Sequence, residues 1–403
     1  MDTLEKIVSL CKRRGFIFPS SEIYGGLAGT YDYGPLGVEL KNNIKRLWWE
    51  SFVLRRRDMF GFDSAILMNP KVWEASGHLE NFTDQLTEEK TFNTIFKTSV
   101  GATQDTALGI YLSPETAQGM FVNFKNIVDA FHQKLPFGIA QIGKAFRNEI
   151  APRDFLFRVR EFEQMEIEYF VREDQWKEQF EKWRGATREW IHAIGIAKDH
   201  IIEHEVPQEE RAHYSKRTLD FNYVYPFGEG ELYGLAYRTD FDLKAHGLTY
   251  YDEEQKETFV PHVIEPSFGI ERLILAILCE VYTEDDMGGE KRIVLKLDQK
   301  IAPIKIAVFP LLANKPDLVA KAKEIFDILH TSRSMLHAPI AWDDNGNIGK
   351  RYRRQDEIGT PWCVTVDFQT LEDNTVTVRD RDTGAQTRHP IAGLESYFTS
   401  ALL

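Results

Sequence analysis

The chain has 403 residues, 43% of them hydrophobic, and a formal net charge of −13. This length predicts a large buried core and more than one domain, and the acidic balance argues against a protein that coats nucleic acid without specificity. Three scattered cysteines without a CxxC pair argue against a zinc knuckle and predict a reduced, cytoplasmic chain. No apolar run is long enough to cross a bilayer, so no membrane association is expected.

The first part of the chain predicts two amphipathic helices and a strand between them. Residues 31–53 read as a turn followed by a helix, with one apolar stripe formed by Leu36, Leu40, Ile44, Leu47 and Phe52. The stretch "FDSAILMNP" that follows predicts a strand closed by Pro70. Residues 173–195 repeat apolar side chains at helical spacing, which favours core packing of Trp176, Phe180, Trp183, Trp190 and Ile194.

Beyond about Leu297 the pattern changes. The segments "IKIAVFPLL", "PDLVAKAKEIFDIL", "WCVTVDF" and "TVTVRDRD" alternate as strand, helix, strand and strand. This order predicts a compact α/β module of about one hundred residues. We place the boundary at residues 299–303, which gives predicted domains of 1–300 and 301–403.

The stretch "FRNEIAPRDFLFRVREFEQMEIEYF", residues 146–170, predicts a hairpin with two different faces. After its loop one parity is mostly apolar, and the other carries Arg158, Arg160, Phe162, Gln164, Glu166 and Glu168. Arg147 suits a phosphate, because a planar guanidinium bonds two oxygens at once, and a ring among charges is well placed to stack on a base. The alternative is a half-buried strand with a salt-bridged solvent face.

The stretch "EPSFGIERLILAIL", residues 265–278, predicts a turn and then an apolar helix with Arg272 near its start. Stacked over a base opposite Phe162, Arg272 would gain a cation–π contact of about 1–2 kcal/mol. The alternative is an ordinary ion pair. No GxxxxGK[ST] loop is present, and "YGGLAGT" is not GxGxxG, so a nucleotide would be held by side chains on a sheet.

With these motifs in order, the chain resembles the class II aminoacyl-tRNA synthetases, and among them the dimeric glycyl-tRNA synthetases. The resemblance covers nearly the whole chain and is specific because many segments occur in the order of that family. They are "GGLAGTYDYGPLGVELKNNIK", "SGHLENFTD", "LSPETAQGMFVNFKN", "FRNEIAPRD", "ELYGLAYRTDFDLKAHG", "VIEPSFGIER" and "IGKRYRRQDEIGTPWCVTVDF".

The resemblance implies an α+β fold, with a class II antiparallel sheet flanked by helices and followed by a C-terminal α/β anticodon-binding domain. It implies family motifs at residues 37–70, which would form a dimer interface, at 146–170 and at 265–278. The implied activity is ATP-dependent attachment of glycine to its tRNA through a glycyl-adenylate, performed by a cytoplasmic homodimer. ATP and Mg²⁺ are the implied cofactors, and no zinc is expected.

The resemblance also implies site residues. The implied catalytic residues are Arg147, Glu149 and Arg272. The implied ATP-binding residues are Arg147, Asn148, Glu149, Phe157, Arg158, Val159, Arg160, Glu161, Phe162, Glu231, Leu232, Gly269, Ile270, Glu271 and Arg272, with adenine between Phe162 and Arg272. The implied glycine-binding residues are Glu115, Phe162, Glu163, Gln164, Met165, Glu166, Arg238, Glu265, Pro266, Ser267, Phe268 and Gly269. Glu231 is the candidate Mg²⁺ ligand.

The implied amino-acid site makes chemical sense. Three carboxylates bind the three donors of an α-ammonium, and an Arg takes the carboxylate. Packed acids leave little volume for a β-carbon, and exclusion by overlap is a strong filter, whereas a missing methyl group costs a competitor only about 1–3 kcal/mol. The smallest amino acid is thus selected without an editing domain.

Some features depart from the family or leave alternatives open. The connection between Asp84 and Ser113 is short and contains no cysteine, and Tyr237 stands where a smaller polar residue is expected. The run "GKRYRRQDE" is either a basic patch for tRNA or a solvated helix face. Another class II synthetase and a non-catalytic paralogue that binds RNA or a polymerase remain the alternative functions.

Overall fold

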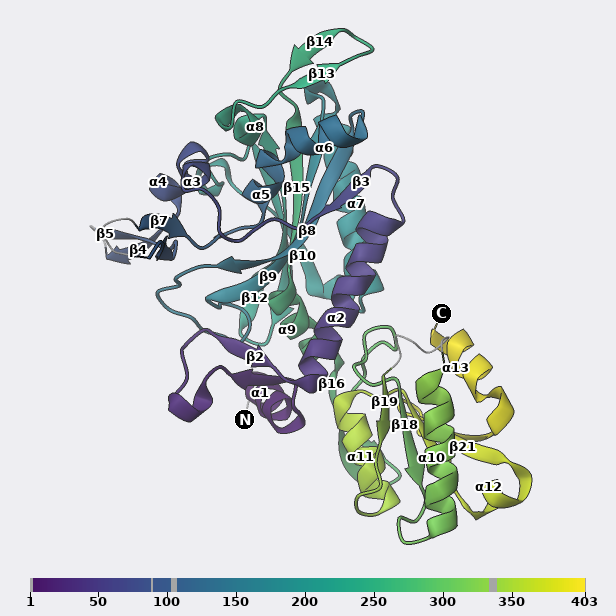
Figure 1. Ribbon diagram of the computed structural model, residues 1–403. Helices are drawn as coiled ribbons and strands as arrows, with labels where there is room; N and C mark the ends of the chain where they lie inside the picture. Colours follow the sequence, from purple (N-terminus) through teal and green to yellow (C-terminus); the bar gives the residue numbers. More distant parts are fainter. Residues whose placement is uncertain (1–2, 88–89, 103–106, 333–338, 403) are drawn as a thin grey trace. The chain divides into compact units, whose positions relative to one another are not determined.

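The computed structural model describes residues 3–87, 90–102, 107–332 and 339–402 (Figure 1). Part of the short connection between Asp84 and Ser113 lies outside these ranges. Contacts divide the chain into two compact units. The larger unit contains Pro19–Tyr31 and Lys45–Ala276, and the second unit contains Met1–Phe18, Asp32–Ile44 and Ile277–Leu403.

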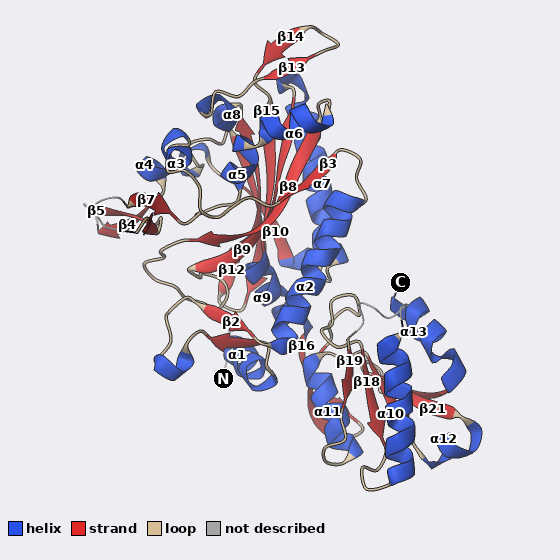
Figure 2. Cartoon of the chain, in the orientation of Figure 1, coloured by secondary structure: helices blue, strands red, loops and turns tan. Residues whose placement is uncertain are grey.

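A seven-stranded sheet organises the larger unit. Its order is β10 (Ile201–Glu205), β11 (Arg217–Tyr225), β12 (Gly228–Thr239), β15 (His262–Gly269), β9 (Glu161–Val171), β8 (Phe137–Phe146) and β3 (Met59–Phe62). All neighbours are antiparallel except β3 and β8, which are parallel. The long strands β8, β9, β12 and β15 lie side by side in Figure 2. The α+β prediction is therefore confirmed.

One face of this sheet is apolar and covered by helices. On β9 the Tyr169 ring lies 5.2 Å from Trp183 of α7 (Trp176–Ala193). On β15 the Phe268 ring lies 5.8 Å from Trp48, at the end of α2 (Pro35–Trp49), and 5.3 Å from Phe52. The predicted helical stripes are confirmed for most members, because Leu40, Ile44, Phe52, Phe180, Trp183, Trp190 and Ile194 are all buried.

The opposite face of the sheet is apolar only at one end. There α5 (Ala117–Val122) and α6 (Phe124–Phe131) pack on the strands, and the Phe124 ring lies 4.6 Å from Phe170. Towards the other end, the same strand parity carries Gln164, Glu166 and Glu168. The face therefore changes from aromatic to acidic along a single strand, β9.

Two predictions about strands in the larger unit are wrong. The stretch "FDSAILMNP" does not form a strand up to Pro70, because β3 ends at Phe62. Beyond it the backbone N–H of Ser64 donates to Oε1 of Gln141 at 3.2 Å. A side chain therefore takes the place of the backbone acceptor that a neighbouring strand would supply. The strand after the hairpin loop begins at Glu161 and not near Phe157, because Asp154 and Phe155 have positive φ angles of 56° and 55° and form a turn.

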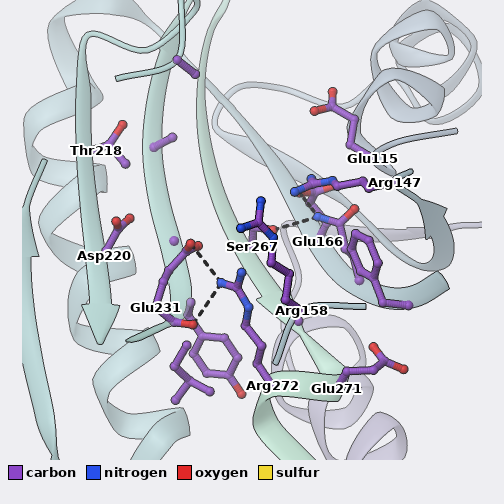
Figure 3. A pocket seen from close by; sticks show the side chains of 18 of the residues that line it. Glu115, Arg147, Arg158, Glu166, Thr218, Asp220, Glu231, Ser267, Glu271 and Arg272 are labelled. Atoms are coloured by element: carbon purple, nitrogen blue, oxygen red, sulfur yellow. Dashed lines mark hydrogen bonds and ion pairs between the residues drawn. The ribbon is translucent and has the colours of Figure 1, made fainter. Parts of the chain in front are cut away.

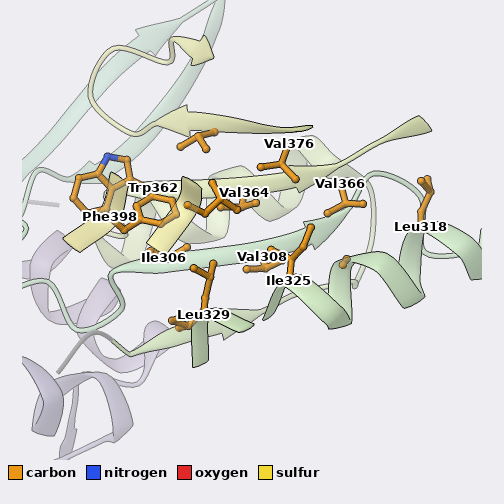
Figure 4. Packing of buried hydrophobic residues seen from close by; sticks show 14 residues of the cluster. Ile306, Val308, Leu318, Ile325, Leu329, Trp362, Val364, Val366, Val376 and Phe398 are labelled. Atoms are coloured by element: carbon orange, nitrogen blue, oxygen red, sulfur yellow. The ribbon is translucent and has the colours of Figure 1, made fainter. Parts of the chain in front are cut away.

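The second unit contains a five-stranded sheet in the order β19 (Ile340–Trp342), β18 (Ile306–Pro310), β20 (Trp362–Val366), β21 (Thr375–Asp380) and β22 (Gln386–Pro390). Its helices include α10 (Pro316–Thr331), α11 (Ile348–Ile358), α12 (Phe368–Asp373) and α13 (Leu394–Leu402). Figure 4 shows Val308, Ile325 and Val364 inside its apolar core. The predicted order of strand, helix, strand and strand is confirmed, and the additional elements include β19, α11, α12, β22 and α13.

The shorter elements complete the chain. They are α1 (Thr3–Arg14), β1 (Ile17–Pro19), η1 (Glu22–Tyr24), β2 (Tyr31–Tyr33), η2 (Glu50–Leu54), α3 (Lys71–Ala75), α4 (His78–Asn81), β4 (Thr83–Thr87), β5 (Lys90–Asn93), β6 (Lys97–Val100), β7 (Leu108–Tyr111), α8 (Phe241–Ala245), β13 (Tyr250–Asp252), β14 (Glu257–Phe259), α9 (Ile270–Val281), β16 (Tyr282–Met287) and β17 (Glu290–Leu295). Across the described residues, no helix combines the length and the apolar character needed to cross a bilayer.

The predicted basic patch on "GKRYRRQDE" is largely absent as an exposed surface. Arg351 is buried and donates to the carbonyl oxygens of Asp344 and Gly346 at 2.9 and 2.7 Å, and to that of Pro310. Arg354 forms a two-pronged pair with Asp343 at 2.8 Å, and Arg353 pairs with Glu290 at 3.0 Å. The run therefore stabilises the second unit, and among its four basic residues Lys350 alone is exposed.

A buried ion cluster in the second unit generates a stability prediction. Asp356 is 1% exposed and accepts from Arg379 at 2.8 and 3.0 Å and from Arg292 at 3.1 Å. We expect Asp356→Asn to lower the free energy of unfolding by about 3–5 kcal/mol, because the buried guanidinium of Arg379 loses its counter-charge and Arg292 keeps only Asp285. Denaturant titration measures this.

The matched control is Asp382→Asn. The Asp382 side chain is 49% exposed and pairs with Arg381 at 2.8 Å. Arg381 is buried but also donates to the carbonyl oxygens of Leu297 and Gly359, and water can replace the half-exposed carboxylate of Asp382. This variant is therefore expected to lose much less stability than Asp356→Asn. Equal losses in the two variants would contradict the role given to Asp356.

Candidate active site

A cavity of about 520 Å³ opens on the acidic end of the larger sheet (Figure 3). Strands β9, β11, β12 and β15, the first turn of α9 and the loops next to β8 and β9 contribute its walls. Most of the predicted site residues line it, namely Glu115, Arg147, Glu149, Phe157, Arg158, Val159, Phe162, Gln164, Glu166, Glu231, Leu232, Glu265, Ser267, Gly269, Glu271 and Arg272.

Strand register brings the acidic side chains together. Ser267 of β15 is opposite Glu166 of β9, and on the other side Glu265 of β15 is opposite Ala236 of β12. Opposed residues share a face of the sheet, so both carboxyl groups project into the same space. Gly234 is opposite Ser267 and, like Ala236, lacks a bulky side chain. The small residues on β12 therefore leave the cavity open.

Three buried carboxyl groups form one end of the cavity. The hydroxyl of Thr116 donates to Glu166, and the amide of Gln118 donates to Glu115 at 3.2 Å. Burial raises the pKa of Glu166, with a further contribution from Glu115. Burial also raises the pKa of Glu265 to about 8, although Arg238 opposes the shift. Glu265 therefore favours its protonated form near neutral pH, and the pKa of Glu166 is shifted in the same direction.

Glu115 behaves differently from its neighbours. Burial alone would raise its pKa, but the nearby charges of His78 and Arg238 outweigh burial and hold the pKa of Glu115 well below its usual range. Nε2 of His78 lies 3.1 Å from Oε2 of Glu115. Glu115 is therefore the member of the acid cluster that stays ionised.

A fourth acid, Glu168, lies deeper on the same strand face. It is completely buried, and within the described part of the chain neither of its carboxyl oxygens has a hydrogen-bond partner. Burial and the neighbouring charge of Glu265 raise the pKa of Glu168 well above its usual value. A neutral Glu168 avoids the cost of an unpaired charge in the interior.

Arg238 does not reach the cavity. Its guanidinium is buried and donates to Asp242 at 2.7 and 2.8 Å and to Glu265, and the Tyr214 ring covers it at 3.7 Å. The sequence predicts that Arg238 takes the carboxylate of the ligand, but the structure commits this side chain to the acids around it. Arg238 therefore holds the cluster in place.

Arg147, the predicted phosphate-binding residue, has a side chain held by well-defined contacts. Arg147 follows the last residue of β8, and its Nε donates to the carbonyl oxygen of Pro114 at 3.0 Å. Its guanidinium lies 5.2 Å from the centre of the Phe162 ring and 5.1 Å from that of Phe82. Figure 3 shows Arg147 beside Glu115, on the same side of the cavity. A guanidinium held between two rings is preorganised for an anion.

Arg272 lies in the first turn of α9, as predicted. Its Nη1 pairs with a carboxylate oxygen of Glu231 at 2.9 Å, and its guanidinium lies 4.6 Å from the centre of the Phe157 ring. The ordinary ion pair, which was the alternative interpretation of Arg272, is therefore present. Phe162 and Arg272 line the same cavity, but each stacks on a different partner, so the sandwich around a purine stays a prediction.

The remaining predicted residues turn away from the cavity. Glu163 pairs with Lys45 at 3.2 Å, while Glu161 pairs with Lys144. Arg160 donates to the carbonyl oxygens of Ala28 and Glu149. Met165, Pro266, Phe268 and Ile270 are buried side chains that do not line the cavity, and neither does that of Asn148. Side chains alternate along a strand, so a continuous range of residues cannot all face one ligand.

Sequence reasoning missed several cavity residues, most clearly Asp220 of β11. Figure 3 shows Asp220 beside Glu231 and Arg272. Burial raises the pKa of Asp220 to about 7, and the charge of Glu231 adds to the shift against the opposing charge of Arg272. The sequence carried a signal for Asp220. Leu219 and Phe221 on either side of it are buried on one face of β11, so Asp220 lies on the opposite face of the strand.

Two carboxylates, Asp220 and Glu231, face each other across neighbouring strands. An added Cβ at Gly234 would lie 3.9 Å from Oδ1 of Asp220 and 3.8 Å from Oε1 of Glu231, so both oxygens border the same small space. Among the described residues, no three His, Cys, Asp or Glu side chains converge in a way that would hold a metal ion. Mg²⁺ needs only one or two protein carboxylates when phosphates supply the other oxygens, so this pair fits it.

The raised pKa of Glu265 predicts a pH dependence of stability. In the unfolded chain the carboxyl releases its proton near its ordinary value of 4.5, whereas the folded state holds it up to about pH 8. The folded state binds more protons between these values, so the free energy of unfolding falls as pH rises through this window. Glu265→Gln removes this contribution and should reduce the slope by up to about 1.4 kcal/mol per pH unit.

Urea titrations at about pH 5.5, 6.5 and 7.5 measure this slope. The control is Glu178→Gln, at an exposed position on α7, which should keep the slope of the parent. Identical slopes in the parent and in Glu265→Gln would contradict a proton held at Glu265.

Comparisons with known proteins define the class of this fold and site. Residues 96–281 match the family described as tRNA synthetase class II core domain (G, H, P, S and T). Residues 305–400 match the family described as anticodon binding domain. The cavity and every strand of the larger sheet except β3 thus fall within a class II synthetase core, followed by an anticodon-binding domain.

Relatives identify the family within this class. The chain is 44% identical to a glycine–tRNA ligase of Macrococcus caseolyticus, over 98% of this chain and 97% of the relative. It is 44% identical to one of Thermobifida fusca, over 100% and 98%, and 45% identical to one of Geobacillus thermodenitrificans, over 98% and 97%. The chain belongs to the glycine–tRNA ligase family of class II synthetases. These alignments cover 458–460 positions, so the relatives carry residues without a counterpart here.

Proposed function

We propose that this chain joins glycine to its tRNA in two steps, through a glycyl-adenylate formed from ATP in the cavity of the larger unit. One observation carries the site assignment: the acid cluster and Arg147 lie in the same cavity, with Glu115 beside Arg147. An ammonium and an α-phosphate bound at these groups would be adjacent. That adjacency is what adenylate formation requires.

The acid cluster suits the ammonium of a small amino acid. Glu115, Glu166 and Glu265 supply acceptors for three N–H donors, and Ser267 is a further polar group in the same wall. Because Glu166 and Glu265 have raised pKa values, an incoming ammonium would displace protons from them. The packed acids also limit the volume beyond the α-carbon, so larger amino acids are refused by overlap.

Adenylate formation needs positioning more than a protein nucleophile. A carboxylate oxygen of glycine forms a bond to the α-phosphorus, and the bond from that phosphorus to the bridging oxygen breaks as pyrophosphate leaves. Arg147 would bind the α-phosphate and stabilise the charge that develops there. In the second step a hydroxyl of the terminal ribose of the tRNA attacks the glycyl carbonyl and AMP leaves.

The far end of the cavity would hold the nucleoside and its metal. We place the purine between Phe162 and Arg272, where the ring and the guanidinium offer stacking surfaces. Glu231 and Asp220 are the candidate ligands of Mg²⁺, which would neutralise phosphate charge when bound. Glu149, which pairs with Arg158 at 2.6 Å, would lie next to the nucleotide.

The organisation of the whole chain is part of the proposal. Catalytic and anticodon-binding domains at 1–300 and 301–403 are supported by the family matches at 96–281 and 305–400. A homodimer with an interface at residues 37–70, a cytoplasmic location and the absence of zinc follow from the family resemblance. The tRNA would contact the second unit, but the contacts cannot rest on the buried Arg351.

The central test is ATP–pyrophosphate exchange with each amino acid. We expect exchange with glycine only, and Arg147→Ala should lower it about 10²–10³-fold, because charge stabilisation at the α-phosphate is lost. Arg188→Ala, at an exposed position on α7, is the matched control and should exchange like the parent. Exchange with proline, threonine or serine would favour another class II synthetase, and a folded protein without any exchange would favour a non-catalytic paralogue.

The metal assignment has its own test. We expect Asp220→Asn and Glu231→Gln each to raise the Mg²⁺ concentration for half-maximal exchange about tenfold or more, because each removes one carboxylate from the pair. Asp174→Asn, at an exposed position, should leave the Mg²⁺ dependence unchanged. An unchanged Mg²⁺ dependence in Asp220→Asn would remove Asp220 from the site.

A further inference from the structure

A short segment outside the predicted site contacts two neighbouring groups of the cavity wall, Glu115 and Arg147. The segment Ser76–Phe82 contains the single turn of α4, and Gly77, directly before that turn, has a φ of 75°, in the left-handed region that favours glycine. Ser76 and His78, on either side of Gly77, are both buried. This geometry directs His78 and Phe82 toward different groups of the cavity wall.

His78 supports Glu115. The hydroxyl of Ser76 lies 2.7 Å from Nδ1 of His78, and Nε2 lies 3.1 Å from Oε2 of Glu115. If the Ser76 hydroxyl donates to Nδ1, the proton of the ring is on Nε2 and faces the carboxylate. The contact has ion-pair distance, but among the described residues Nε2 forms no regular hydrogen bond. The ring of His78 and the guanidinium of Arg238 both face Glu115, since Nη2 of Arg238 lies 3.7 Å from Oε1.

Phe82 supports Arg147 through a column of rings. The His78 ring lies 5.4 Å from Trp73 and 5.5 Å from Phe82, with which it is stacked. The Phe82 ring lies 5.1 Å from the guanidinium of Arg147, whose other ring neighbour is Phe162. Trp73 is fully buried. The column therefore begins in the core and ends at the proposed phosphate-binding group.

Backbone hydrogen bonds fix this segment to the hairpin. The N–H of Thr94 donates to the carbonyl oxygen of Phe82 at 3.1 Å, and the N–H of Asn148 donates to the carbonyl oxygen of Thr94 at 2.7 Å. The amide of Asn93 also donates to the carbonyl oxygen of Leu79 at 2.9 Å. Two backbone hydrogen bonds, with Thr94 between them, therefore connect the segment to Asn148, the residue that follows Arg147.

We propose that His78 and Phe82 are positioning residues for the two substrates: His78 orients Glu115 for the ammonium of the amino acid, and Phe82 fixes the plane of Arg147 for the α-phosphate of ATP. This inference rests on the proposed function, because it assigns Glu115 to the amino acid and Arg147 to the phosphate. It assigns two separable roles to two residues of one short segment. A merely structural segment would affect both substrates alike.

The test compares KM values for the two substrates in ATP–pyrophosphate exchange. His78→Leu removes the ring N–H groups and should raise the KM for glycine about tenfold, with the KM for ATP within about twofold of the parent. His78→Gln keeps an N–H donor and should recover part of the loss. Phe82→Leu removes the ring face and should raise the KM for ATP about threefold or more, with the KM for glycine unchanged. Phe82→Tyr keeps the ring face and should behave like the parent.

Further controls distinguish a failure of the positioning roles from misfolding and from a failure of the proposed function. An unfolded fraction lowers the apparent kcat but leaves both KM values in place, so the split in KM is insensitive to it. If Glu115→Gln raises the KM for glycine while His78→Leu does not, or if each variant shifts both KM values equally, the positioning roles are wrong. If Glu115→Gln also leaves the KM for glycine unchanged, the glycine site itself is wrongly placed. Where His78→Leu does not fold, the same criteria apply to His78→Gln against an exposed control, His192→Gln.

Discussion

The site depends on the burial of negative charge around a single guanidinium. Arg238 is enclosed by Asp242, Glu265 and the Tyr214 ring, and the carboxyl groups next to this cluster outnumber the cations that neutralise them. In an interior of low dielectric constant such an excess either binds protons or attracts a cation. The raised pKa values of Glu166 and Glu265 reflect the first outcome, and affinity for an ammonium is the second. Selectivity for a small zwitterion and the proton content of the folded state therefore have the same physical origin.

The register of the strands brings together the residues that form the two ends of the cavity. Along β9 one parity faces helices and the other changes from Phe170 through the acids to Phe162, so one strand contributes to the core, the acid cluster and the proposed purine platform. Small residues on β12 keep the space above the sheet open, and α9 adds Arg272 directly after β15. The side chains are close because antiparallel pairing places distant parts of the chain opposite each other.

Much of this arrangement could be predicted from the sequence. The helical stripes of residues 31–53 and 173–195, the α/β pattern after residue 300 and the position of Arg272 at the start of a helix all follow from periodicity and turn residues. The errors have identifiable causes. The strand after Phe62 is lost because a glutamine side chain captures the backbone, and the basic run is internal because Arg351 caps carbonyl groups of a loop. The first interaction joins residues 77 positions apart, and Arg351 also donates to Pro310, 41 positions away, so a local pattern does not show them. His78 lies within one of the family segments, but its contact with Glu115 depends on tertiary packing.

The contact between Nε of Arg147 and the carbonyl oxygen of Pro114 has a consequence for substrate length. Pro114 directly precedes Glu115, so a hydrogen bond and one peptide unit link the proposed phosphate-binding group to the residue that would hold the amine. The spacing between these anchors is therefore restrained by a short local connection and not left to a flexible loop. A substrate such as β-alanine, whose amine and carboxylate are one methylene further apart, would place its nucleophilic oxygen out of line with phosphorus. The enzyme would thus reject it by mismatch of span, even though it has no larger side chain to exclude.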